Sequence, residues 1–334
     1  MVNHSGQFER VKGLFSSVFE AGEAVKAYVV EVPTANCRVH VYGDKKGEKA
    51  GSIRVHGDLK GGTVFNERLR LCASWRIDAG QKMSREERRQ KRMELAVKQA
   101  ERVQRELLES RENAFTASMI LRECVPAINH PYLIKKRITP TSSMFEIDAS
   151  TVDAIMSERG IRSDKGIAYR TGLSGRLLVI PLCRGTELCS LQFIEANGRK
   201  RFMKGGRVGG AYWLSQPIEA YQCGRVIGIA EGVATARSVE LVEGVPCVAS
   251  MSSGNLRNVA VYLVNKFPDK HFWILSDVGN GEEDARKAGE AIGGLVTKPP
   301  FTPDIVRDFK AITGSDNPTD WNDFCIATGR LGNG

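Results

Sequence analysis

Apolar and polar positions divide the chain into segments with different periods. Residues 1–22 are expected to form a short helix that ends at Gly22. From Ala27 to Trp75, short apolar runs alternate with Gly, Asp and Lys, which predicts a small β-rich unit. The candidate strands of this unit are AYVVEV, CRVHVYG, SIRVHGD and GTVFNE.

A long charged segment without Gly or Pro follows, from Lys82 to Cys124. Its apolar residues form only a thin stripe, which predicts a helix that acts as a spacer or arm. Acidic and basic residues are interleaved, so we favour a solvated helix with ion pairs one turn apart over a direct contact with DNA. After a loop-rich boundary at Pro126–Pro140, RLLVIPL and LCSLQFIE are expected to pair as a hairpin.

In the last third of the chain, apolar runs of strand length alternate with amphipathic helical segments. The runs are RVIGIAEG, VPCVASM, KHFWILSD and GLVTKPP. This alternation predicts a parallel sheet built from βα units. The expected fold class is therefore α+β, with a small N-terminal β-rich unit, a long helical linker and a C-terminal α/β domain that has a Rossmann-like parallel sheet. The expected domain boundaries are 1–78, 79–125, 126–220 and 221–334.

Composition adds a basic balance to this picture. The formal net charge is +9 and the pI is about 9.2, which favours a polyanionic partner because Lys and Arg release counterions from phosphates. The first residues lack the apolar core of a signal peptide, and no apolar run is long enough to span a bilayer. The cysteines are scattered without a CxxC pair, so we expect reduced thiols in a cytoplasmic protein, without a membrane partner.

Four residues of the N-terminal unit are candidate zinc ligands: Cys37, His40, His56 and Cys72. A degenerate zinc ribbon would use them in this way. The alternative is that the cysteines are strand residues and the histidines face solvent. Because only one ligand pair is closely spaced, we favour this alternative and do not expect zinc.

Two carboxylates end apolar strands of the C-terminal domain. Glu231 follows VIGIA, and Asp277 follows FWILS. In an open parallel sheet, ligands bind beyond the carboxyl ends of the strands, and carboxylate oxygens suit Mg²⁺. Each residue alone would be explained by a position at a helix N-terminus. Together they favour a divalent metal site.

A third acidic cluster contains Asp320 and Asp323, directly before and within a short helical segment. Structurally it is a candidate for a helix cap. Chemically, its carboxylates are candidates for further metal ligands.

The order of these motifs resembles the Toprim domain of bacterial-type primases, topoisomerases and some nucleases. The residues that carry the resemblance are EGVATA at 231–236, the strand ending in Asp277, and the DWND cluster at 320–323. Upstream, HPYL, RLLVIPL, SLQFI and KRFMKGG are similar to primases of phages and conjugative plasmids. The resemblance covers roughly residues 125–325, so residues 126–220 are expected to form a primase-type subdomain that binds template and nucleotide.

The resemblance implies template-directed synthesis of short RNA primers with Mg²⁺ or Mn²⁺. Glu231 and Asp277 would be catalytic, and Glu231, Asp277, Asp320 and Asp323 would be the metal ligands. The expected contacts to nucleic acid or nucleotide are made by Arg176, Lys200, Arg201 and Lys204. The chain departs from the family pattern at Gly279, where a second aspartate usually follows Asp277. Glu282, Glu283, Asp284, Asp320 and Asp323 are candidates to compensate.

Three functions remain open at the level of sequence. The first is a primase that uses single-stranded DNA and ribonucleoside triphosphates in phage or plasmid replication. The second is an adaptor that binds single-stranded DNA or replication proteins with a degraded acidic site, and the third is a Toprim nuclease. No GxxxxGK[ST] loop occurs, so we expect any replicative helicase to be a separate chain.

Overall fold

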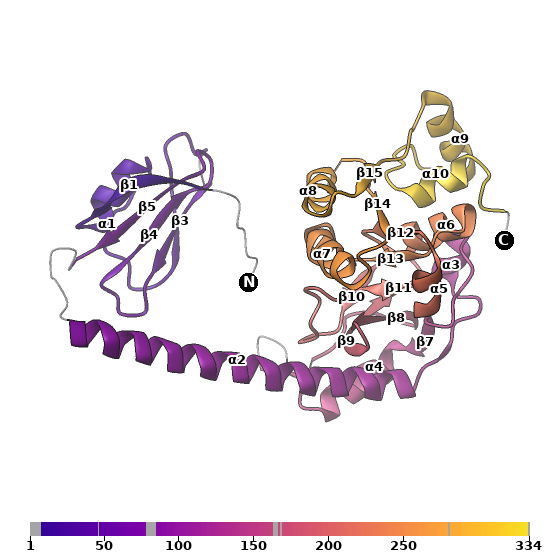
Figure 1. The fold of residues 1–334 in the computed structure, drawn as a ribbon, viewed down its shortest axis with the longest axis horizontal. Coiled ribbons are helices and arrows are strands. Elements are labelled where there is room, and N and C mark those ends of the chain that lie inside the picture. The colour runs from indigo at the N-terminus through magenta and orange to yellow at the C-terminus, as the bar shows by residue number, and fades with distance from the viewer. Residues whose placement is uncertain are drawn as a thin grey trace. The chain divides into compact units, whose positions relative to one another are not determined.

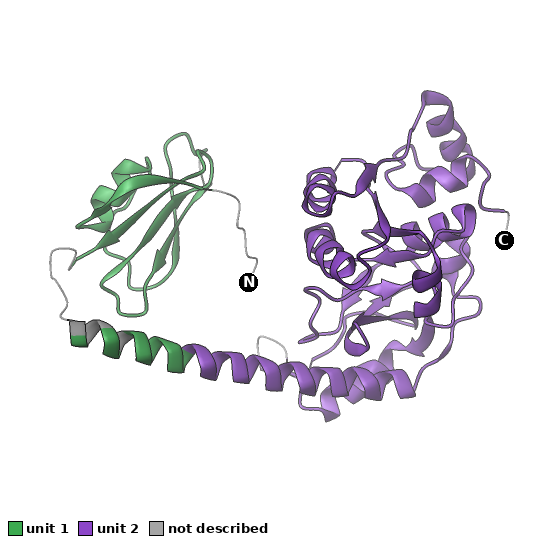
Figure 2. Ribbon diagram, in the orientation of Figure 1, with its two compact units in different colours: residues 1–98 green, residues 99–334 purple. Residues whose placement is uncertain are grey.

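The chain forms two compact units, residues 1–98 and 99–334, whose boundary lies within one long helix (Figure 2). The computed structural model describes residues 8–45, 47–77, 85–162, 166–167, 169–279 and 281–332, with the backbone alone at 85, 87, 88 and 91. Within these ranges, no helix is long and apolar enough to cross a membrane.

Unit 1 is a five-stranded sheet with one short helix packed against it (Figure 1). The strand order is β1-β5-β4-β3-β2. Its elements are β1 (Glu9–Phe15), α1 (Val18–Ala24), β2 (Cys37–Val39), β3 (Gly51–Val55), β4 (Gly61–Asn66) and β5 (Leu71–Arg76). Alternate residues of β3 to β5, such as Ile53, Val64 and Trp75, are buried against α1, because successive side chains of a strand point to opposite faces.

Two predictions for this unit are wrong in whole or in part. The helix expected over residues 1–22 is a strand over Glu9–Phe15, which pairs in parallel with β5, and only its last residues, from Val18, are helical, as part of α1. Gly13 has a φ of +113°, a backbone conformation that does not fit a helix, and residues 1–7 of the prediction lie outside the described residues. The expected strand AYVVEV contributes only an isolated bridge at Ala27, and Val30 is 90% exposed. The other three candidate strands are confirmed as β2, β3 and β4.

Gly62 provides a test of the packing of unit 1. A Cβ at this position of β4 would clash with the carbonyl oxygen of Arg54, a backbone atom that cannot rotate away. We expect Gly62→Ala to destabilise the sheet by about 1–3 kcal/mol, whereas Gly57→Ala, where a Cβ meets nothing within 4 Å, serves as the control. Amide hydrogen exchange should accelerate in β3–β5 and stay unchanged in unit 2. Equal protection in both variants would contradict this packing.

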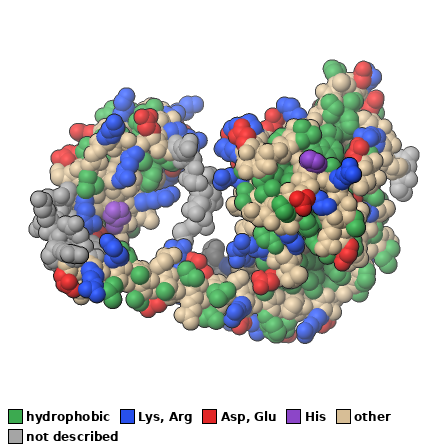
Figure 3. All heavy atoms as spheres, in the orientation of Figure 1, with side chains coloured by type: hydrophobic (Ala, Val, Ile, Leu, Met, Phe, Trp, Pro, Cys, Tyr) green, Lys and Arg blue, Asp and Glu red, His purple; other side chains and the backbone are tan. Residues whose placement is uncertain are grey.

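The long charged segment forms helix α2 (Arg85–Arg122), as predicted. Its exposed part carries ion pairs one turn apart, such as Lys98 with Glu94 and Arg102 with Glu106. Basic and acidic side chains are interspersed over the face of the protein in Figure 3. The C-terminal end of α2 belongs to unit 2, and its Ala117 and Ile120 are fully buried in the core of that unit.

Unit 2 contains two further five-stranded sheets. The first has the order β10-β9-β8-β7-β6. Its elements are β6 (Val125–Pro126), α3 (Pro131–Lys135), β7 (Phe145–Asp148), α4 (Ala149–Glu158), β8 (Arg176–Arg184), β9 (Glu187–Ile194) and β10 (Lys200–Phe202). The predicted hairpin is confirmed, because β8 and β9 pair antiparallel. Leu177 and Val179 pack toward α2 and α4, whereas Leu178 and Ile180 pack on the opposite side, so β8 is buried on both faces.

The second sheet is the predicted α/β sheet, and its order is β11-β13-β12-β14-β15. Strands β12 to β15 are parallel, and β11 is an antiparallel edge strand. Its elements are β11 (Trp213–Leu214), α5 (Ile218–Cys223), β12 (Val226–Ala230), α6 (Val233–Glu243), β13 (Cys247–Ala249), a 3₁₀ turn (Ser253–Asn255), α7 (Leu256–Lys266), β14 (His271–Leu275), α8 (Glu282–Ile292), β15 (Leu295–Thr297), α9 (Pro303–Thr313) and α10 (Trp321–Ala327).

The connections of this sheet reverse direction between β12 and β14. From β12 the chain moves through α6 to β13 on one side, then through α7 to β14 on the other side of β12. Helix α6 packs in the core shared with the first sheet, whereas α7 and α8 pack on the opposite face. The carboxyl ends of β12 and β14 therefore lie at a topological switch point, where open α/β sheets form their binding crevice.

Candidate metal and phosphate site

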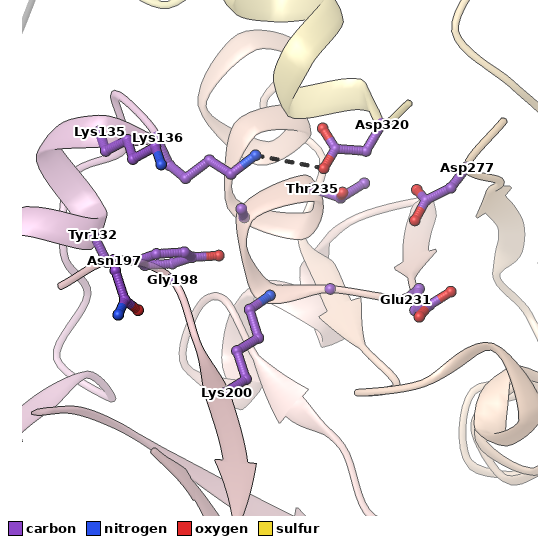
Figure 4. A pocket seen from close by; sticks show the side chains of 12 residues that line it. Tyr132, Lys135, Lys136, Asn197, Gly198, Lys200, Glu231, Thr235, Asp277 and Asp320 are labelled. Atoms are coloured by element: carbon purple, nitrogen blue, oxygen red, sulfur yellow. Dashed lines mark ion pairs between the residues drawn. The ribbon is translucent and has the colours of Figure 1, made fainter. Parts of the chain in front are cut away.

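Glu231 and Asp277 lie at this switch point. Ala230 of β12 is in register with Leu275 of β14, so Glu231 and Asp277 leave neighbouring strands at the same edge of the sheet. Gly232 is the N-cap of α6, and Gly281 is the N-cap of α8, so neither acid is itself a helix cap. Figure 4 shows the two carboxylates next to each other on one wall of a cavity.

The cavity has a volume of about 330 Å³ and a mixed charge. Its charged lining residues are Lys135, Lys136, Lys200, Glu231, Asp277 and Asp320. Lys200, the first residue of β10, points into the space in front of the acids, and Tyr132 lies beside Lys200 (Figure 4). The Nζ of Lys200 lies 5.5 Å from the centre of the Tyr132 ring, a cation–π distance.

Burial and the crowding of negative charge raise the pKa of each acid that lines this cavity. Burial raises the pKa of Asp277 to about 7, and repulsion from Asp320, Glu231 and Asp323 adds to the rise. Burial likewise raises the pKa of Glu231, against the opposing effects of Lys200 and a hydrogen bond from the backbone of Ser253. The Oδ1 of Asp277 is buried without a hydrogen-bond partner among the described residues. An unpaired buried carboxylate oxygen is costly, and a cation would remove that cost.

Asp320 and Asp323 are tied to a lysine. The Nζ of Lys136 lies 3.6 Å from Oδ2 of Asp320 and 3.2 Å from Oδ1 of Asp323. Burial lowers the pKa of Lys136, but the two acids more than offset this, so its pKa is raised. Asp320 is also the N-cap of α10, where its Oδ1 accepts from the N–H of Asp323, as the cap interpretation predicted. Burial raises the pKa of Asp320, although Lys136 opposes the rise.

The donors present are those that Mg²⁺ or Mn²⁺ prefers, since they are carboxylate oxygens, one of them unpaired. These oxygens do not form a complete set of metal ligands. In the described ranges, no three Asp, Glu, His or Cys side chains stand close enough to form a preassembled metal site. Asp277, Glu231 and Asp320 face one cavity, and Asp323 is held outside its lining by Lys136 and by the N–H of Thr319.

The structure separates the predicted basic residues. Lys200 alone of the four lines the cavity. Arg176 forms an ion pair with buried Glu146 at 2.9 Å, and Lys204 lies 5.6 Å from the ring centre of Tyr169. Arg201 is exposed on β10. The cavity is lined instead by three residues that were not predicted from the sequence: Tyr132, Lys135 and Lys136. All three lie in the HPYLIKK segment, whose two adjacent lysines could have indicated them.

The candidate zinc ligands of unit 1 are not brought together. Cys37 is exposed on the edge strand β2, whereas Cys72 is buried on β5. Strands β3 and β4 lie between them, and three strand spacings correspond to about 14 Å. A single tetrahedral ion, with bonds of about 2.3 Å to sulfur, cannot bind both cysteines in this sheet. His40 follows the edge strand and lies 3.9 Å from Asp44, and His56 follows β3.

Comparison with known proteins places the acidic site within a known domain. Residues 226–330 match the family model of the Toprim domain. Two curated relatives, both named DNA primase TraC from Escherichia coli, are 29% identical over 278 residues and 30% identical over 292 residues. These matches cover 80% and 83% of this chain but 24% and 18% of the relatives, so the chain spans a quarter or less of their length.

Among solved structures, the crystal structure of the Aquifex aeolicus primase, containing zinc-binding and RNA polymerase domains, matches with a TM-score of 0.43 and 12% identity. That match covers 94% of this chain and 80% of the Aquifex chain. The resemblance to Toprim-containing primases that the sequence motifs indicated is confirmed by the domain match and the curated relatives.

Proposed function

We propose that this chain is a primase that joins ribonucleotides into short primers on single-stranded DNA. Support comes from one observation above all. In a Toprim domain, at the switch point of its sheet, Glu231 and the unpaired carboxylate of Asp277 face a cavity that also contains Lys136 and Lys200. Acids beside lysines suit phosphoryl transfer, which requires a metal site and a phosphate site in contact.

In the proposed reaction, the 3′-hydroxyl oxygen of one nucleotide attacks the α-phosphorus of the next. A new phosphodiester bond forms, the bond between the α-phosphorus and the bridging oxygen breaks, and pyrophosphate leaves. Glu231 is the residue we propose to accept the hydroxyl proton, because its carboxylate faces the cavity at the carboxyl edge of the sheet.

Glu231, Asp277 and Asp320 would hold Mg²⁺ or Mn²⁺. When bound, the cation stabilises the negative charge that develops on the transferred phosphate. Lys200 is placed to bind phosphate oxygens, since its side chain points into the cavity in front of the acids (Figure 4). Lys136 holds Asp320 in position through the ion pair.

The assay that tests this function combines the protein with a single-stranded template, ribonucleoside triphosphates and either Mg²⁺ or Mn²⁺. We expect short oligoribonucleotides whose formation requires template and metal. Single-strand binding without synthesis under any divalent metal would instead favour the adaptor function. Cleavage of DNA in the absence of nucleotides would favour the nuclease.

A separate replicative helicase is the partner we propose for the primase.

The adaptor function has one structural observation in its favour. Gly279 stands where a second aspartate is usual, and its φ is +90°, a conformation that Asp seldom adopts. The backbone of this loop is therefore in a conformation that disfavours an aspartate at position 279. The N–H of Gly279 donates to Glu282 at 2.8 Å, and Glu282 also pairs with Lys298, so Glu282 is occupied.

Asp284 is the acid that we propose compensates for Gly279. It lies in the first turn of α8, is half-buried, and its charge contributes to the raised pKa of Glu231. We expect Asp284→Asn to lower primer synthesis about 10- to 100-fold and to raise the metal concentration needed for half-maximal rate.

The neighbouring Glu283→Gln is the matched control. Glu283 is exposed and pairs with Arg286 and Lys287 on its own helix, so the rate should stay within about twofold of wild type. Primer synthesis should be measured as a function of Mn²⁺ concentration for both variants. Equal metal curves for Asp284→Asn and Glu283→Gln would rule out this role for Asp284.

A further inference from the structure

A second cavity lies in unit 2, at the other end of β9 from the acidic site. Its volume is about 670 Å³, and it opens between α2, the β8–β9 turn and α7. Glu187 at the start of β9 lines this cavity, whereas Asn197 and Gly198, beyond the end of β9, line the acidic one. The eight residues of β9 separate the two by about 23 Å.

Three arginines from different elements line this second cavity. Arg111 comes from α2, Arg184 from the end of β8, and Arg207 from the loop after β10. In the part of the chain that the structure describes, none of them forms an ion pair, and Glu187 is the one acid in the lining. Three arginines and one acid leave the lining with a net positive charge, which favours an anionic ligand, and a guanidinium binds phosphate through two parallel hydrogen bonds.

Two aromatic rings line the same cavity. Phe115 of α2 is 50% exposed, and the guanidinium carbon of Arg159 lies over its ring, 5.1 Å from the ring centre. Tyr262 of α7 lies with its ring centre 5.9 Å from the guanidinium carbon of Arg184 and 5.7 Å from the ring centre of Tyr212. A half-exposed ring and a partly buried ring in a cavity lined by arginines match a ligand that has both flat bases and phosphates.

A short stretch of chain connects this cavity to the acidic site. Lys200 points into the first cavity, and Arg207 lines the second, seven positions later. Seven residues span at most about 25 Å. At about 3.4 Å per stacked nucleotide, a strand of roughly seven nucleotides would reach from one cavity to the other.

We propose that the second cavity binds a single strand of nucleic acid, with phosphates on Arg184 and Arg207 and bases on Phe115 and Tyr262. A continuous strand is favoured over a free nucleotide because the three arginines come from separate elements around a cavity of about 670 Å³, which two separate aromatic rings also line. The inference rests on the proposed function only in naming that strand as the primase template.

The test measures binding of fluorescein-labelled (dT)4 and (dT)12 to the full chain by fluorescence anisotropy, in EDTA and without nucleotides. We expect the double variant Arg184→Gln/Arg207→Gln to bind (dT)12 at least ~10-fold more weakly than wild type at low salt. The slope of log affinity against log salt concentration should fall by about 0.7 for each phosphate that the variant no longer binds. Phe115→Leu should weaken binding about fivefold or more while leaving the salt slope unchanged.

The matched control is Arg307→Gln/Arg330→Gln. It removes the same charge from unit 2 at two arginines that pair with Asp304 and Glu243 outside the cavity. If the test and control variants lose affinity equally, the inference is overturned. It is also overturned if ATP binds wild type but not the double variant and displaces (dT)12, because the occupant would then be a free nucleotide.

Crosslinking gives a second measurement that needs no variant. A (dT)12 strand with 5-iodouracil should crosslink to peptides that contain Phe115 or Tyr262, and crosslinks confined to other peptides would contradict the proposal. The two proposals fail separately. Loss of binding in the arginine variants, in a protein that makes no primers, would retain this site and reject the primase function. Unchanged binding in the arginine variants of a protein that makes primers would reject this site and retain the primase function.

Discussion

Glu231→Gln is expected to lower primer synthesis by about 10³-fold and to leave affinity for single-stranded DNA almost unchanged. The substitution keeps the shape of the side chain and removes both its charge and its capacity to accept a proton, which are worth about 10²- to 10⁴-fold in rate. Binding of the strand depends on the basic residues, so it should persist. Incorporation of labelled ribonucleotide into short products measures the first quantity, and anisotropy in EDTA measures the second.

Glu243→Gln is the control for this experiment. Glu243 ends the helix that begins just after Glu231, and it pairs with Arg330 at 2.9 Å outside the cavity. The same chemical change there should leave synthesis within about twofold of wild type. A Glu231→Gln protein that retains substantial primer synthesis would remove Glu231 from the catalytic site.

Asp277→Asn should abolish synthesis and yet stabilise the metal-free protein above neutral pH. The pKa of Asp277 is raised from 3.8 to about 7, so between these pH values the folded state binds a proton that the unfolded state has released. Stability therefore falls as pH rises from about 4 to about 7, and the loss is complete above 7. Asparagine has no such charge and avoids this loss.

In EDTA at pH 8, we expect the Asn variant to melt at least ~4 °C above wild type, because each kcal/mol shifts a domain of this size by about 2–4 °C. The difference should shrink as pH falls toward 4. Adding Mn²⁺ should raise the melting temperature of wild type much more than that of the variant, since the ligand stabilises only the form that binds it. A variant that melts below wild type at pH 8 would show that Asp277 is not under electrostatic strain.

This combination of lost activity and gained stability is expected of a site that concentrates like charges. Asp277, Glu231 and Asp320 repel one another across a small cavity, and Lys136 and Lys200 reduce that repulsion only partly. Their arrangement is unfavourable for the isolated protein and favourable for binding a divalent cation.

The sequence was sufficient to predict that Glu231 and Asp277 lie at the same edge of the sheet, because the rule for parallel sheets is local. Each acid directly follows an apolar strand, and parallel strands present their carboxyl ends at one edge. Lys136 was not predictable in this way. It lies 187 positions before Asp323, to which it donates, and no periodic pattern relates the two segments. Tyr132 depends on the same long-range packing.

The errors also have local causes. Glu9–Phe15 contains apolar residues whose spacing fits a helix or a strand, and pairing with β5, more than 50 positions later, decides in favour of a strand. Arg176 was predicted to bind nucleic acid because a basic residue opens an apolar strand. Its partner Glu146 is buried on β7, and a buried carboxylate requires a counterion, so Arg176 is occupied.

We propose that Glu231 and Asp277 together hold a divalent cation at the carboxyl edge of the α/β sheet. Titration of the full chain with Mn²⁺, followed by electron paramagnetic resonance of the free ion, tests this most directly. We expect at least one bound Mn²⁺ in wild type and in Glu243→Gln, and loss of that ion in Glu231→Gln and in Asp277→Asn. Unchanged Mn²⁺ binding in both acid variants would contradict it.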